Sequence, residues 1–227
     1  MKKILIILFC LMAYGQLFAQ ADYSGKYSYT FPPSGNPPKT EKNRGPSGQL
    51  YLLKMHDNLY RFWLDITNGW PSYHVGETDG TIQIVNDTSS FDNTFEGASD
   101  ECILKFKIHQ KTIKIQSSDN AFNCGFGAGV TADGEYKFDK VQPIFNNAWL
   151  RKQYYMSPTV EVIKNKVSLY KDENCHYPKP FFFKKGDRFL SIAENKDNIY
   201  TEFIDAKNNF VYGWLPKTTI KTIPEKE

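Results

Sequence analysis

The sequence predicts an all-β protein made of two small antiparallel modules in tandem. Apolar and aromatic residues alternate with polar ones over short stretches, and Gly, Asn and Asp residues with turn propensity separate these stretches. Aromatic residues make up 15% of the 227 residues, which suits half-buried pleated strands. No long stretch shows the 3.6-residue apolar period of an amphipathic helix. Short strands therefore account for the pattern better than helices do.

The first 21 residues have the order of a secretory signal peptide. Lys2 and Lys3 precede an apolar run from Ile4 to Met12, and the small-residue pattern Ala19-Gln20-Ala21 follows. A spanning helix needs about 20 apolar residues, and this run is much shorter. We expect an exported protein, periplasmic or extracellular, without a transmembrane segment. Lipid attachment at Cys10 is the alternative.

The remaining chain is expected to contain two domains and to bind no nucleic acid. Residues 22–145 form the predicted N-terminal module, 146–159 a linker and 160–223 a second module. Basic and acidic side chains nearly balance after the signal peptide, which argues against a nucleic-acid partner. From Arg151 onward basic residues are in slight excess, either by scatter of surface charges or as a functional basic face.

Strands and turns dominate the N-terminal module. Tyr27, Tyr29 and Phe31 occupy every second position and so share one face of a first strand. The predicted hairpins pair residues 49–55 with 59–66, 73–75 with 81–85 across Asp79-Gly80, and 102–108 with 112–116, before a last strand at 135–138. Seven or eight such strands hide their edges by closing into a small barrel, with an open or sandwich arrangement as the alternative.

The cysteines predict one disulfide. Cys102 and Cys124 lie in the same module, and an exported protein meets oxidising conditions, so we expect these two to pair. Cys175 lies beyond the linker and is expected to be free or to pair between molecules.

The pattern around these cysteines resembles a set of small exported bacterial β domains. It consists of His74-Val-Gly-Glu-Thr-Asp-Gly80, Glu101-Cys102, Cys124-Gly-Phe-Gly127 and Val130-x-Ala-Asp-Gly-x-Tyr136. The resemblance implies a disulfide-bonded β-barrel and an exported location, and it implies no activity.

No catalytic, metal or cofactor site is predicted. The histidines are dispersed and lack the spacing of zinc ligands. Cys175 and His176 are adjacent in a loop, where the imidazole cannot reach the sulfur as a base. We therefore expect a protein that is not an enzyme.

The C-terminal module resembles the bacterial SH3-like domain. Its short strands and turns run from about Val160 to Ile223, and its final strand carries the step Gly213-Trp214-Leu215. The resemblance implies a five-stranded barrel without catalytic activity that binds cell-wall peptides or proteins. In that family the aromatic residue of this step closes the barrel mouth, and the glycine lets the backbone cross.

Aromatic side chains beside the loops are the candidate binding residues, because rings supply contact area at little entropic cost. These candidates are Tyr170, Tyr177, Tyr200 and Tyr212, with Lys184 and Lys185 as partners for acidic groups. Trp214, Phe189 and Phe203 are expected in the core instead.

Three function classes follow from these observations. The first is an exported binding protein whose SH3-like module contacts cell-wall peptide or an envelope protein. The second is an inhibitor or immunity-type protein that blocks a cell-wall hydrolase with the Pro32–Ser47 loop. The third is a hydrolase, although the sequence shows no arrangement of serine, cysteine or carboxylate residues that predicts hydrolysis.

Overall fold

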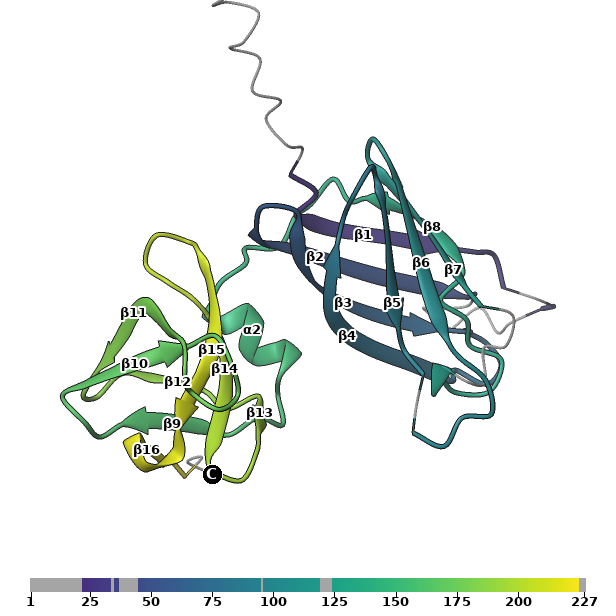
Figure 1. Cartoon of the computed structure of the whole chain (residues 1–227). Helices are drawn as coiled ribbons and strands as arrows, with labels where there is room; N and C mark the ends of the chain where they lie inside the picture. The colour runs from purple at the N-terminus through teal and green to yellow at the C-terminus, as the bar shows by residue number, and fades with distance from the viewer. Residues whose placement is uncertain (1–21, 34, 37–44, 95, 119–123, 225–227) are drawn as a thin grey trace, which may run out of the picture.

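The structure is a computed structural model that describes residues 22–33, 35–36, 45–94, 96–118 and 124–224. The expected signal peptide and most of the Pro32–Ser47 loop lie outside the described residues. The chain forms two β units, with the short helix α2 (Asn147–Gln153) between them (Figure 1). The predicted all-β fold class is confirmed.

Eight antiparallel strands form the first unit, a barrel-like sheet that is nearly closed. They are β1 (Gly25–Thr30), β2 (Ser47–His56), β3 (Leu59–Thr67), β4 (Val75–Gln83), β5 (Thr88–Asp92), β6 (Ile103–His109), β7 (Thr112–Ser117) and β8 (Gly134–Phe138). Their order is β4-β3-β2-β1-β8-β7-β6-β5. The outer strands β4 and β5 follow each other in the chain, and the bridge Val85↔Thr88 joins their ends. The sheet therefore curls until its two edges meet.

Alternation along the strands fills the inside of this barrel. Tyr27 and Tyr29 of β1 are buried as predicted, whereas Phe31 lies past the strand end and is half exposed. Tyr60, Phe62 and Leu64 of β3 also point inward and are almost completely buried. The period of two in the sequence thus marks the core face of the sheet.

The predicted hairpin turn at Asp79-Gly80 is wrong, because both residues lie inside β4, paired with Trp63 and Phe62 of β3. Gly80 has a packing role instead. A Cβ atom there would come within 2.3 Å of the Phe91 ring and 3.0 Å of the Phe62 ring. The actual turn is Asn86-Asp87, whose positive φ angles of 50° and 59° fit a tight hairpin.

The linker contains a helix that the sequence did not predict. Asn146 caps α2, with its side-chain oxygen accepting a hydrogen bond from the Trp149 amide at 2.9 Å. The Asn147 side chain exchanges two hydrogen bonds with the backbone of Ile204, at 2.8 and 2.9 Å. These bonds fasten the helix to the second unit.

Two antiparallel sheets form the second unit. The five-stranded sheet has the order β11-β10-β15-β14-β13 and the three-stranded sheet the order β12-β9-β16. Their strands are β9 (Thr159–Val162), β10 (Lys166–Tyr170), β11 (Pro178–Lys184), β12 (Arg188–Leu190), β13 (Ala193–Glu194), β14 (Asn198–Ile204), β15 (Phe210–Pro216) and β16 (Ile220–Thr222), with a 3-10 turn at Lys217–Thr219.

The step Gly213-Trp214 lies where β15 passes β10. A Cβ atom on Gly213 would come within 2.4 Å of the Tyr170 carbonyl oxygen, so glycine is required there. Phe189 is buried and Phe203 packs on the same core, as expected. Trp214 departs from the expectation: it is half-buried on the other face of β15 and packs on the Tyr200 ring at 5.4 Å.

The predicted disulfide between Cys102 and Cys124 is confirmed, and Cys175 is free. Both bonded cysteines are buried in the barrel core.

We predict that C102A/C124A lowers the free energy of unfolding by about 3 kcal/mol in urea titrations, since the bond closes a loop of 22 residues. C175S is the control and should unfold like the wild type. Non-reduced peptide mapping that found Cys124 linked to Cys175 would contradict the pairing.

Candidate functional site

The middle of the outer face of β3 is buried, whereas Asp65 farther along the same face is exposed. Arg61 and Trp63 point away from the barrel core and yet are only 8% and 4% exposed. Side chains of α2, β14 and β15 cover them, and this cluster is called the junction below. Its buried members are Trp63, Leu150, Tyr154, Leu190, Ile204 and Phe210. The barrel and the second unit therefore share an apolar interface.

A buried ion pair lies at the centre of the junction. Arg61 Nε is 3.0 Å from Oε1 of Glu202, whose residue is only 2% exposed. The Tyr154 hydroxyl accepts a hydrogen bond from Arg61 Nη2 at 2.8 Å and donates one to Glu202 at 2.5 Å. Asp79 also accepts from Arg61 Nη2, and the Tyr200 hydroxyl donates to Glu202 at 3.2 Å. Every charge in the junction thus has a partner.

The balance of burial and partners determines the ionisation of Glu202. Burial raises the pKa of Glu202 above its ordinary value, against the opposing effects of Arg61 and of the Tyr154 and Tyr200 hydroxyls. Without Arg61 the buried carboxylate would lose its main counter-charge.

We predict that R61M lowers the free energy of unfolding at pH 8 by about 3–5 kcal/mol, because it leaves a buried charge unpaired. The deficit should shrink at pH 5: a carboxyl with a raised native pKa takes up a proton on folding, so stability rises as the pH falls. Urea titrations at both pH values measure this. R188M is the matched control, since Arg188 pairs with Glu161 at an exposed site and solvent screens that pair.

Adding E202L to R61M should recover much of the loss, because an apolar pair can replace a buried ion pair. A double variant whose loss equals the sum of the two single losses would contradict this coupling.

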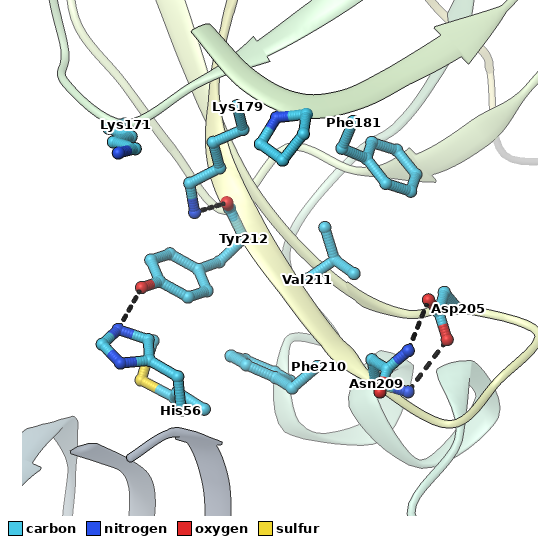
Figure 2. Close-up of a pocket in the computed structure, with 11 residues that line it drawn as sticks. His56, Lys171, Lys179, Phe181, Asp205, Asn209, Phe210, Val211 and Tyr212 are labelled. Carbon is cyan, nitrogen blue, oxygen red and sulfur yellow. Dashed lines mark hydrogen bonds between the residues drawn. The ribbon is translucent and has the colours of Figure 1, made fainter. Parts of the chain in front are cut away.

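An open pocket of about 580 Å³ lies beside the junction (Figure 2), within the roughly 300–1,000 Å³ typical of ligand sites. Its lining comes from the end of β2, the residue that follows β10, the first half of β11, the turn after β14 and the first half of β15. The lining residues are Met55, His56, Lys171, Lys179, Pro180, Phe181, Asp205, Asn209, Phe210, Val211 and Tyr212.

Tyr212 connects the two sides of the pocket. Its hydroxyl lies 3.1 Å from Nε2 of His56, and the centroid of its ring lies 3.4 Å from the Lys179 amine. The same amine donates a hydrogen bond to the Tyr212 carbonyl oxygen at 2.5 Å. Burial, assisted by nearby Lys171, lowers the pKa of Lys179 to about 8. The amine is therefore charged at neutral pH, where it contacts the ring and the carbonyl oxygen of Tyr212.

The predicted binding residues do not form one cluster. Tyr212 lines the pocket, and Tyr200 lies in the junction with its hydroxyl on Glu202. Tyr170 is half-buried, and Tyr177 is 66% exposed on the loop before β11. Lys184 and Lys185 lie at the far end of β11, exposed and outside the lining of the pocket.

Sequence reasoning missed Arg61, Glu202, His56 and Lys179. One signal was present: Trp63 alternates with inward residues of β3, and a tryptophan on the outer face of a strand indicates that something covers that face. Lys179 gave no signal, because only the fold brings it to β15.

Burial raises the pKa of Cys175 to about 11, so its thiol is protonated at neutral pH. No group of three or more His, Cys, Asp or Glu side chains within the described residues is placed to hold a metal ion. None of the described helices is long and apolar enough to cross a membrane.

A search among curated proteins finds no match to the chain. One family, described as a protein of unknown function (DUF1102), matches residues 107–209, less than half of the chain. The match begins in β6 and ends in the turn between β14 and β15, so it crosses the helix and takes in parts of both units.

Proposed function

We propose that the protein is an exported binding protein whose C-terminal unit is an SH3-like module and whose ligand is a polypeptide, either cell-wall peptide or an envelope protein. The observation that carries the proposal is the pocket, where basic side chains border an apolar floor. Lys171, Lys179 and His56 supply the basic border, and Phe181 and Phe210 belong to the floor.

Three further observations support this proposal. The Cys102–Cys124 disulfide suits an oxidising compartment outside the cytoplasm. The crossing of β15 over β10 at Gly213 corresponds to the step on which the SH3-like resemblance rests. The pocket combines a few polar groups with apolar walls, which is the composition of binding sites.

The experiment is co-sedimentation of the chain from residue 22 with purified peptidoglycan, beside capture of envelope proteins on the immobilised chain. We predict that K171M/K179M lowers retention roughly tenfold, since it removes two charge-assisted contacts. K164M/K196M is the matched control, because both lysines are exposed and lie outside the pocket. Equal retention by both double variants would exclude the pocket as the contact site.

The same assay covers the other predicted surface and the other function classes. Loss of retention in Y170A/Y177A, with K171M/K179M unaffected, would move the site to those tyrosines. Inhibition of added lysozyme would indicate an inhibitor, and release of soluble muropeptides would indicate a hydrolase.

A further inference from the structure

One half of β15 has an open backbone edge inside the five-stranded sheet. On one side β15 pairs with β14 from Phe210 to Pro216. On the other side β10 pairs with it only through Tyr170↔Trp214, because the chain turns away after Tyr170. Among the described strands, none pairs with the edge from Phe210 to Tyr212, which borders the pocket instead.

The hydrogen-bond pattern tells which groups point to this edge. The amide of Asp205 donates to the Asn209 carbonyl at 3.0 Å, so this pair faces inward across the hairpin. In an antiparallel ladder the orientation alternates, which turns the amide and carbonyl groups of Phe210 and Tyr212 away from β14. The bond from the Lys179 amine to the Tyr212 carbonyl confirms this orientation. A lysine thus occupies a position that a neighbouring strand would take.

Charge is distributed unevenly along the pocket. Lys171, Lys179 and His56 gather at one end and Asp205 lies at the other (Figure 2). The Asp205 carboxylate already accepts hydrogen bonds from Lys207 and Asn209 at 2.8–3.0 Å, which lowers its pKa. At the basic end His56 lies 3.4 Å from Asp57, so the group offered to an acidic ligand is the Lys179 amine, which contacts the ring and the carbonyl oxygen of Tyr212.

We infer that the pocket binds an extended peptide by strand addition along Phe210–Tyr212, with an acidic side chain or carboxylate of that peptide on Lys179. The inference rests on the proposed function and specifies its ligand. An amide of the peptide donates a hydrogen bond to the Tyr212 carbonyl oxygen in place of the Lys179 amine. The released amine then pairs with the carboxylate of the peptide. Main-chain bonds give affinity in this mode, and the charged end gives specificity.

The probes are fluorescein-labelled degenerate pentapeptides with Glu, Gln or Lys fixed at the centre, and the readout is fluorescence anisotropy. At pH 7 we expect the Glu-centred pool to bind roughly tenfold more tightly than the other two, from one charge-assisted contact. In K179M this preference should vanish, and in the control K164M it should persist. Thermal melting checks that both variants are folded.

Raising the pH to 9 should also weaken the preference for Glu, because Lys179 loses its proton near pH 8. Lys171 and the Tyr212 ring lie nearest to this amine, and the other titratable groups of the pocket lining are His56, on the Tyr212 hydroxyl, and Asp205, at the opposite end.

Backbone methylation separates strand addition from side-chain binding alone. Two Glu-centred pools are compared, one N-methylated at the odd amides and one at the even amides. Their affinities should differ, since only every second amide of an added strand faces β15. One pool should lose about tenfold in affinity and the other little. Equal behaviour of the two methylated pools, an equal affinity for all three charge pools, or a preference that survives in K179M would overturn the inference. If K171M/K179M still lowered retention on the wall or envelope, the proposed function would stand without strand addition.

Discussion

The buried pair of Arg61 and Glu202 is the constraint on which the arrangement of the two units depends. Its members come from β3 and β14, which are distant in the sequence, and each would be costly to bury alone. Because Tyr154 binds both side chains, the helix is also fixed at this point. The pocket lies next to the same interface, and both units contribute to it. Lys171 and Lys179 come from the second unit, and His56 comes from the barrel.

The rest of the junction is apolar and supplies the binding energy that an ion pair does not. Trp149 of α2 packs its ring on Trp63 and Phe145 at 4.8 Å each. A buried ion pair adds little net stability over a well-packed apolar pair, but it penalises any arrangement that leaves one charge unpaired. The aromatic contacts thus hold the units together, and the charges select how they meet.

Most of the barrel could be predicted from sequence because alternation and turn residues report local geometry. The hairpin at residues 49–66 and the disulfide follow from such signals. The turn predicted at Asp79-Gly80 was wrong because Asp-Gly is also a common turn dipeptide. Here the glycine is required instead by the packing of aromatic rings against it. Helix α2 has only seven residues, too few to show a helical period. The pocket depends on contacts between distant strands, which no local pattern contains, so only Tyr212 among its residues was predicted.

The claim that the two units meet through this junction is tested most directly by NMR in solution. The His56 and Tyr212 rings come from different units, and their centroids lie 6.4 Å apart in a stacked arrangement. The structure predicts nuclear Overhauser effects between the protons of these two rings in the wild-type protein, and their loss in a folded R61M variant. If the wild type showed strong intra-unit effects for both rings and none between them, the junction and the pocket beside it would be contradicted.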